Sequence, residues 1–278
     1  MSDPLSNHNY RPKKRSKRIV GLVPAAGKAA RLSPLPFSKE LYPIGLQRLH
    51  NDRNLTPKPV CVYLLEKMHQ ASISEAYIVI RKGKWDIPAY LGDGSMLHMH
   101  LAYLIMRLPL GVPYTLDQAY PFVKDSMVVL GFPDIIFSPE DAFESLLTRQ
   151  AESSADVVLG LFPAKQPHKT DMVDLDADGR IREIQIRPTR TNLRFSWIIA
   201  VWTPAFTQFM HDYLIGLQDQ SRRSDIGSNL TGRRELFVGD VIRAAIDNHL
   251  DVEGILVQDG IYLDIGTPDT LHKAIRDS

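Results

Sequence analysis

The chain has 278 residues, of which 44% are hydrophobic and 23% are charged, a balance typical of a globular protein with a substantial core. Its formal net charge is +1, but six cations and one acid lie within residues 1–18, so that this segment carries +5 and the remainder −4. The composition therefore excludes a nucleic-acid-binding body. We expect a disordered basic tail at 1–18 and one domain at 19–278.

Other classes of protein are excluded by features that the sequence lacks. No apolar run reaches the roughly 18 residues of a membrane span, and residues 1–10 lack the hydrophobic segment of a secretory signal. The single cysteine, Cys61, rules out a disulfide framework and a cysteine metal cluster, and we interpret it as a core residue. We expect a cytoplasmic protein; whether it is a monomer or a small homo-oligomer stays open.

The stretch 19–43, IVGLVPAAGKAARLSPLPFSKELYP, is the most informative part of the chain. Its first apolar residues predict a short buried strand that ends at Pro24, because proline cannot donate to a sheet ladder. The loop that follows is rich in small residues, which let a ligand approach backbone N–H groups. It also carries two cations, Arg31 and Lys39. Small residues with spaced positive charge favour a polyphosphate ligand.

Spacing excludes two common phosphate loops, since Gly27 is the only glycine in the loop that follows the predicted strand and prolines interrupt any helix. The stretch instead resembles the signature of the sugar-1-phosphate nucleotidyltransferases, roughly AGGxGTRLxPxTxxxxKxLxPI. The matching residues are Ala25, Gly27, Arg31, Leu32, Pro34, Lys39, Leu41, Pro43 and Ile44. Ala26 and Ala29 replace two glycines of that signature.

The remaining pattern predicts alternating strands and helices. A helix that begins at Pro59 and a strand at 76–80 complete a βαβ unit with parallel strands. Further strands are expected at 127–130, 155–162, 181–186, 195–202, 252–257 and 261–263. We also expect an exposed excursion at 46–56, a helix capped by Ser138, and a mobile polar loop at 218–234.

Later segments match the same family at corresponding places. They are Lys58 with Pro59, LGDGS at 91–95, Gln118, Asp134 in LGFPD, Arg187 with Pro188, and YLDIGTP at 262–268. Asp134 departs from the family's LGDN by two extra residues, and the glycine near Gln118 is missing. The family resemblance covers most of 19–276, with specific ends and a loose middle.

The resemblance implies a Rossmann-like nucleotidyltransferase (GT-A-like) α/β fold with a mixed central sheet and a small accessory sheet. It implies transfer of a nucleotidyl group from dTTP, UTP or CTP to a sugar 1-phosphate or related phosphate, with release of pyrophosphate. The implied roles are catalysis by Arg31 and Lys39, nucleotide binding by Ala25, Ala26, Gly27, Lys28 and Gln118, acceptor binding by Arg187 and Asp171, and Mg²⁺ binding by Asp134 and Asp264.

Two alternatives stay open. The first is a sugar-nucleotide-binding protein without turnover, because alanine at 26 and 29 is costly if those backbones need a positive φ. The second is a glycosyltransferase of similar fold, which would need a DxD motif; the candidates lie in an expected hairpin turn at 174–179. The DxDxDG pattern also resembles a calcium-binding loop. A twelve-residue loop of this kind that starts at Asp174 would need glutamate at its last position, where this chain has Gln185.

Two departures from the family bear on the acceptor. Ile186 stands where the family has a glutamate that accepts hydrogen bonds from sugar hydroxyls, and Asp171 stands where it often has a glycine. Asp171 would crowd a hexose, or bind a differently placed hydroxyl or a cationic substituent. We therefore expect an acceptor other than glucose 1-phosphate: a deoxy sugar, an amino sugar, or a phosphorylated polyol or amino alcohol. Local misalignment is the competing interpretation.

Overall fold

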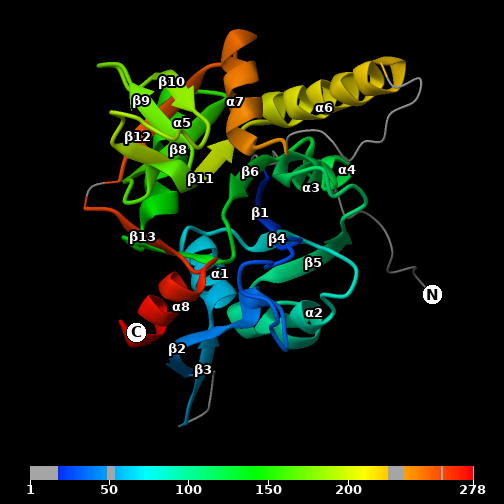
Figure 1. The fold of residues 1–278 in the computed structure, drawn as a ribbon, viewed down its shortest axis with the longest axis vertical. Coiled ribbons are helices and arrows are strands. Elements are labelled where there is room, and N and C mark those ends of the chain that lie inside the picture. Colours follow the sequence, from blue (N-terminus) through cyan, green and yellow to red (C-terminus); the bar gives the residue numbers. More distant parts are fainter. Residues whose placement is uncertain (1–17, 49–53, 225–234, 258, 278) are drawn as a thin grey trace, which may run out of the picture.

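The computed structural model describes residues 18–48, 54–224, 235–257 and 259–277 (Figure 1). Of the basic tail expected at 1–18, residues 1–17 lie outside the described part. The guanidinium of Arg18 donates to Glu75 and to the hydroxyl of Tyr77, at 2.5 and 3.1 Å. No helix within the described residues is long and apolar enough to cross a bilayer.

A mixed sheet that contains nine strands of the described chain forms the centre of the molecule. One half consists of four parallel strands in the order β5–β4–β1–β6: β1 (Ile19–Pro24), β4 (Glu75–Ile80), β5 (His100–Ile105) and β6 (Met127–Leu130). In the other half, β11 (Phe195–Trp202) runs antiparallel to β6 on one side and to β8 (Val157–Pro163) on the other. Strand β8 in turn pairs in parallel with β12 (Val252–Leu256). The hairpin of β9 (Met172–Leu175) and β10 (Ile181–Gln185) joins the first residues of β11.

Two small antiparallel sheets accompany the central one. The first pairs β2 (Pro43–Arg48) with β3 (Leu55–Pro59), and the second pairs β7 (Ile135–Ser138) with β13 (Ile261–Asp264). The excursion expected at 46–56 is exposed, as Leu46 is 62% accessible, and it contains the end of β2 and the start of β3. Residues 49–53 lie outside the described part.

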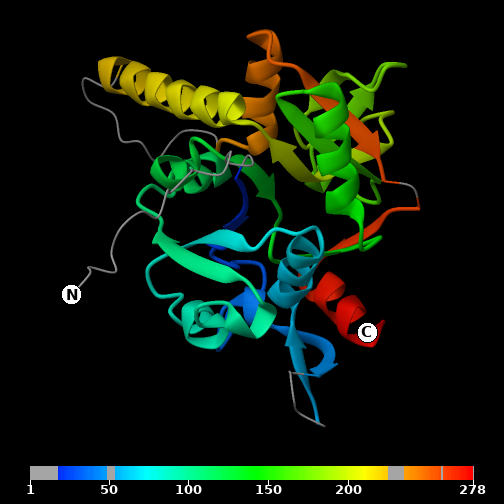
Figure 2. The same ribbon diagram turned by 180° about the vertical axis from the view of Figure 1, so that it is seen from behind.

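Helices cover both faces of the central sheet. One face carries α1 (Val60–Gln70), α2 (Asp86–Leu91) and α5 (Ala142–Ser153), and the view from behind shows α5 in front of the strands it covers (Figure 2). The other carries α3 (Val112–Asp117), α4 (Tyr120–Val123), α6 (Pro204–Ser224) and α7 (Val238–Asp247). Both faces of β1 are buried: Val23 faces the core of α1, and Leu22 the core of α3 and α6. Burial on both faces is typical of a parallel strand covered by two helical layers.

Two predicted helix boundaries were wrong: the start of the helix expected at Ser138 and the end of the helix before the loop expected at 218–234. Contacts in the folded chain decide both. Ser138 does not cap a helix; it is the last residue of β7, opposite Ile261, and α5 begins after Asp141. Helix α6 continues to Ser224, so that 218–224 of the expected loop are helical, and 225–234 lie outside the described part. Buried Leu214 anchors this helix, and residues 217–224 include neither glycine nor proline.

The topology places several loops at one edge of the sheet. Because β4, β1 and β6 are parallel neighbours, the loops that follow them, at 81–85, 25–38 and 131–134, meet at their shared carboxyl edge. β13 reaches the same edge, since Asp264 lies opposite Ile135 and the N–H of Ile265 donates to the carbonyl of Asp134 at 3.0 Å. The C-terminal helix α8 (Pro268–Arg276) then begins with Thr267 as its N-cap, as predicted.

Candidate active site

Lys39 and Asp134 join two of these loops by a direct ion pair. Lys39 opens the short 3₁₀ helix η1 (Lys39–Leu41), and its Nζ contacts Oδ2 of Asp134, with both side chains more than four-fifths buried. Burial lowers the pKa of Lys39, but attraction and hydrogen bonding to Asp134, with weaker attraction to Glu40 and Asp264, outweigh it and raise the pKa. Lys39 is therefore a charged ammonium held among carboxylates at neutral pH.

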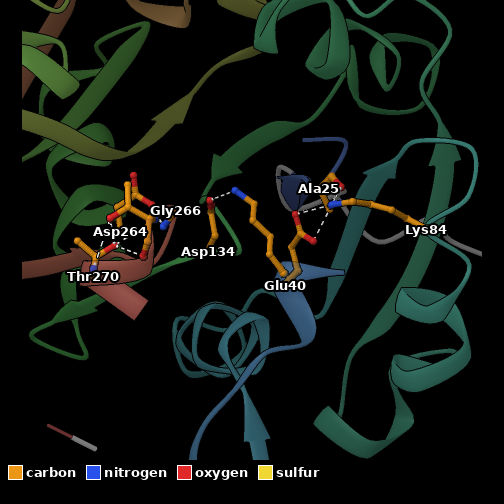
Figure 3. Close-up of polar contacts among 9 residues, drawn as sticks. Ala25, Glu40, Lys84, Asp134, Asp264, Gly266 and Thr270 are labelled. Carbon is orange, nitrogen blue, oxygen red and sulfur yellow. Dashed lines mark hydrogen bonds and ion pairs between the residues drawn. The ribbon is translucent and has the colours of Figure 1, made fainter. Parts of the chain in front are cut away.

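Asp264 is the second carboxylate at this edge. Its Oδ1 accepts a hydrogen bond of 2.7 Å from the N–H of Gly266. Burial raises the pKa of Asp264 and repulsion by Asp134 adds to it, against the lowering influence of Gly266, Lys39 and Arg31. Figure 3 shows Asp134 between the group around Asp264 and the group around Glu40. Two carboxylates that repel each other favour the binding of a cation between them.

Arg31 completes this charged cluster from the loop after β1. A Cβ at Gly266 would lie 2.8 Å from Nη2 of Arg31 and 2.8 Å from Oδ1 of Asp264, so that both side chains lie close to the backbone of Gly266. Arg31 is exposed, whereas Asp264 is partly buried. The cluster of Arg31, Lys39, Asp134 and Asp264 thus has a cation at its accessible side and carboxylates deeper in.

The small-residue loop continues directly from β1. The N–H of Ala25 donates to the carbonyl of Val79 at 2.8 Å, and a Cβ at Gly27 would lie 3.9 Å from Nζ of Lys39. Gly27 and Lys28 are exposed, so their backbone can meet a ligand. Of the two alanines that replace family glycines, Ala29 has a left-handed φ of 53°, whereas Ala26 does not.

A buried ion pair that sequence reasoning missed supports this loop. Nζ of Lys84 donates to the carbonyl of Ala25 at 2.9 Å and to the two carboxylate oxygens of Glu40 at 2.7 and 2.6 Å. Lys84 follows β4, and Glu40 is the neighbour of Lys39. Burial raises the pKa of Glu40 and lowers the pKa of Lys84. The opposite charge of the partner reduces both pKa shifts. Lys84 therefore ties the loop after β1 to the helical turn that presents Lys39.

Ser38 adds a second support that the sequence did not reveal. Its N–H and hydroxyl donate to the two carboxylate oxygens of Asp86, the first residue of α2, at 2.5 and 2.7 Å. The residues on both sides of Lys39 are thus held in place by charged groups that follow β4.

Gln118 is not brought into the charged cluster. Within the described residues its side chain makes one hydrogen bond, in which Oε1 accepts from the N–H of Arg107 at 3.1 Å. A contact with a nucleotide base remains a prediction for this residue.

Asp171 and Arg187 belong to a second cluster, at the start of α7. The guanidinium carbon of Arg187 lies 3.9 Å from the ring centroid of Phe237. A Cβ at Gly239 would lie 2.5 Å from Oδ2 of Asp171, so the carboxylate rests against the first turn of α7. Burial is the largest influence on the pKa of Asp171 and, with repulsion by Asp240, raises it to about 6, against the lowering influence of Arg187 and of hydrogen bonds from the N–H of Gly239 and the indole of Trp197.

The two clusters are neighbours. The ring of Trp197 lies 5.9 Å from that of Phe132, which is two residues before Asp134. The hydroxyl of Thr170 lowers the pKa of Tyr262, two residues before Asp264, although burial leaves that pKa raised overall. The Asp171 cluster therefore lies beside the segments that carry both candidate metal ligands.

The charged cluster fits magnesium better than a transition metal. No group of three or more His, Cys, Asp or Glu residues in the described part could hold an ion. Mg²⁺ needs only one or two carboxylates when substrate phosphates and water complete its shell. The hydrogen bond from the N–H of Ile265 to the carbonyl of Asp134 brings the segments of Asp134 and Asp264 together, and this proximity of two carboxylates favours such an ion here.

Ala29→Gly tests the strain in the loop. Alanine in the left-handed region costs about 1 to 2 kcal/mol, whereas glycine elsewhere costs about 0.5 to 1 kcal/mol of backbone entropy. We expect Ala29→Gly to be about 1 to 2 kcal/mol more stable than the matched control Ala26→Gly, measured by urea unfolding. Equal stability of the two variants would show that Ala29 is not strained.

Lys84→Met tests the buried ion pair. Removing one partner leaves Glu40 charged and buried, which typically costs about 3 to 5 kcal/mol. The control is Lys82→Met, an exposed lysine two residues away, with an expected change below about 0.5 kcal/mol. The double variant Lys84→Met with Glu40→Met should regain most of the loss in urea unfolding; no recovery would contradict the pairing.

Asp171→Asn tests the environment of that carboxylate. Because the folded pKa is raised from 3.8 to about 6, folding takes up a proton between these values. The stability that comes from protonation is complete below pH 3.8 and is lost as the pH rises through 6. The variant should therefore gain up to about 3 kcal/mol relative to the parent between pH 4 and 7. A gap between variant and parent that does not change with pH would refute the shift.

Comparisons with known proteins identify the family of this chain. The nucleotidyl transferase family model matches residues 20–278. A low-salt glycan biosynthesis nucleotidyltransferase of Haloferax volcanii is 23% identical over 260 residues, 92% of this chain and 65% of that protein. A glucose-1-phosphate thymidylyltransferase of Streptomyces antibioticus is 23% identical over 250 residues, 89% of this chain and 63% of that protein.

The chain thus spans just under two thirds of the length of these two relatives. The fold is shared with a solved Bacillus anthracis structure named as a candidate glucose-1-phosphate thymidylyltransferase, with a TM-score of 0.73, 18% identity, and coverage of 93% of this chain and 94% of that one. The predicted mixed-sheet α/β fold is therefore confirmed, and the chain belongs to the nucleotidyl transferase family.

Proposed function

We propose that this protein transfers a nucleotidyl group from a nucleoside triphosphate to the phosphate of a small acceptor and releases pyrophosphate. The observation that carries the proposal is the convergence of Arg31, Lys39, Asp134 and Asp264 at the carboxyl edge of parallel strands. The family match and the names of the relatives support the same reaction class. The donor is dTTP, UTP or CTP, and the acceptor is a sugar 1-phosphate or a related phosphate.

The chemistry asks mainly for neutralisation of charge. An acceptor phosphate is already anionic near pH 7, so its oxygen can attack the α-phosphorus without a general base; the bond to pyrophosphate breaks as the new one forms. The barrier is repulsion between two polyanions, which positioned cations lower. Exposed Arg31 suits the outer phosphates of the donor, and the backbone at Gly27 and Lys28 suits phosphate oxygens.

Lys39 has two roles that differ between the free and the loaded site. In the free protein it neutralises Asp134. With Mg²⁺ held by Asp134 and Asp264, the ion would supply charge neutralisation at the reacting phosphates. Lys39 is then available to a phosphate oxygen, and its raised pKa keeps it charged. Arg187, whose planar guanidinium can bind a phosphate through two hydrogen bonds, receives the acceptor.

A binding protein without turnover is the main alternative, and the left-handed backbone of Ala29 is the observation in its favour. The glycosyltransferase alternative has less support. Asp176 accepts hydrogen bonds from the N–H groups of Asp178 and Arg180 at 2.9 Å, which is a turn role in the β9–β10 hairpin. This turn contributes no side chain to the charged cluster.

Asp134→Asn and Asp264→Asn test the metal role directly. Each should lower Mg²⁺-dependent pyrophosphate release by at least about 100-fold, because a lost carboxylate weakens metal binding. Asp178→Asn is the matched control and should turn over at the parental rate. The assay is pyrophosphate release from each triphosphate with a panel of phosphates at limiting Mg²⁺, with thermal melting to establish that the variants fold. Parental turnover in either variant would remove that residue from the site.

A further inference from the structure

We propose that Lys84 is a positioning residue for the triphosphate donor. Its ammonium group holds the carbonyl of Ala25, so that the N–H of Ala26 is presented to a phosphate oxygen, and through Glu40 it fixes the turn that carries Lys39. Lys84 does not touch the donor; it acts through the loop after β1 and through η1. The inference rests on the proposed transfer reaction and names a residue that prepares its donor site.

A tight turn after β4 presents Lys84. The N–H of Lys84 donates to the carbonyl of Arg81 at 3.2 Å. Gly83, just before Lys84, has a φ of 97°, a conformation that glycine adopts without strain. Lys84 is only 8% exposed, so its side chain extends into the protein rather than into solvent. This basic turn therefore supplies an internal group and not only a solvated one.

The ammonium group of Lys84 has no donor left for a ligand. It donates to the carbonyl of Ala25 at 2.9 Å and to the two carboxylate oxygens of Glu40 at 2.7 and 2.6 Å. A lysine ammonium has three N–H donors, and these three acceptors use them all. Glu40 is 1% exposed. Any effect of Lys84 on a bound phosphate must therefore pass through Ala25 and Glu40.

The bond to Ala25 fixes the direction of the next N–H. The peptide bond between Ala25 and Ala26 is trans, because the described chain has cis bonds only before two of its prolines. In a planar trans peptide the carbonyl and the N–H point in opposite directions. The N–H of Ala26 therefore points away from Nζ of Lys84. Figure 3 shows Lys84 reaching Ala25 from the side opposite to Asp134.

The N–H of Ala26 is a donor without an acceptor among the described residues, whereas the N–H of Ala25 donates to the carbonyl of Val79 at 2.8 Å. Ala26 is 8% exposed, and buried backbone N–H groups are nearly always paired. A Cβ at Gly27 would lie 3.9 Å from Nζ of Lys39, so an ammonium group lies beside this part of the loop. An unpaired N–H close to an ammonium group favours an anion, and the donor phosphates supply one.

The bonds to Glu40 restrain the turn that carries Lys39. Glu40 is the central residue of η1, and the N–H of Tyr42 closes this turn on the carbonyl of Lys39 at 3.0 Å. An anchored carboxylate at the centre of so short a turn limits the movement of the neighbouring backbone. The same ammonium group of Lys84 thus sets the N–H of Ala26 and the side chain of Lys39 relative to each other. Preorganised donors of this kind are what a polyphosphate site needs.

The test uses two variants that separate positioning from stability. Lys84→Met loses both sets of bonds and leaves Glu40 unpaired, whereas Lys84→Met with Glu40→Met also removes the unpaired charge and should regain stability in urea. A purely structural role predicts that the double variant also regains donor binding. We expect instead that the Kd for inorganic triphosphate with Mg²⁺, measured by calorimetry, rises by about tenfold or more in both variants. Lys82→Met is the matched control and should bind as the parent does.

Calorimetry with inorganic triphosphate needs neither a base nor turnover, so it separates this inference from the transfer reaction. Parental affinity in the double variant, or no binding of triphosphate by the parent, would overturn the inference even if pyrophosphate is released in the transfer assay. Binding that depends on Lys84 without any transfer would leave the inference standing and refute the proposed function alone.

The transfer assay adds a second readout. In the double variant the KM for dTTP, UTP or CTP, whichever is turned over, should rise by about tenfold or more. The KM for the acceptor phosphate should change by less than about twofold, because Arg187 belongs to the other cluster. An equal rise of both KM values would show a general disturbance of the site and would contradict a positioning role toward the donor.

Discussion

A single buried ammonium group, that of Lys84, holds together the segments from which the candidate site is built. It bonds to the carbonyl of Ala25, where the small-residue loop begins, and to the carboxylate of Glu40, beside Lys39. The three groups come from the loop after β1, from η1 and from the loop after β4. A buried charge pair with several hydrogen bonds is directional in a way that apolar packing is not, because each bond constrains an angle as well as a distance.

The fixed position of Lys39 in turn organises the charges across the sheet edge. Lys39 forms an ion pair with Asp134, and the charge of Asp134 raises the pKa of Asp264. The guanidinium of Arg31 lies close to the backbone of Gly266. The positive and negative side chains of this cluster pair with one another in the free protein. They could exchange these contacts for contacts with a triphosphate and a divalent cation without large movement of the backbone. Such preorganisation is what lowers the barrier when two anions react, since the protein does not have to reorient its dipoles during the reaction.

Much of this site could be predicted from the sequence, and the reasons are local. The spacing of Arg31 and Lys39, the position of Asp134 after a buried strand, and the Thr267 cap after Asp264 each follow from short-range patterns. Glu40 and Lys84 were missed because their pairing spans 44 residues, and a lysine in an RKGK run is typical of a solvated turn. Ser138 was misassigned because its pairing with β13, far along the chain, outweighed a good capping pattern. The acceptor side was ambiguous for the same reason, since Asp171, Trp197 and Gly239 meet only in the folded chain.

The central claim is that this edge catalyses nucleotidyl transfer rather than binding alone. The most direct measurement is phosphorus NMR of one reaction mixture that contains the protein, Mg²⁺, a nucleoside triphosphate and an acceptor phosphate. The account predicts pyrophosphate and a nucleotide-activated acceptor in equal amounts, with loss of one triphosphate for each. An unchanged triphosphate in the presence of demonstrated nucleotide binding, or pyrophosphate accompanied by free nucleoside monophosphate alone, would contradict it.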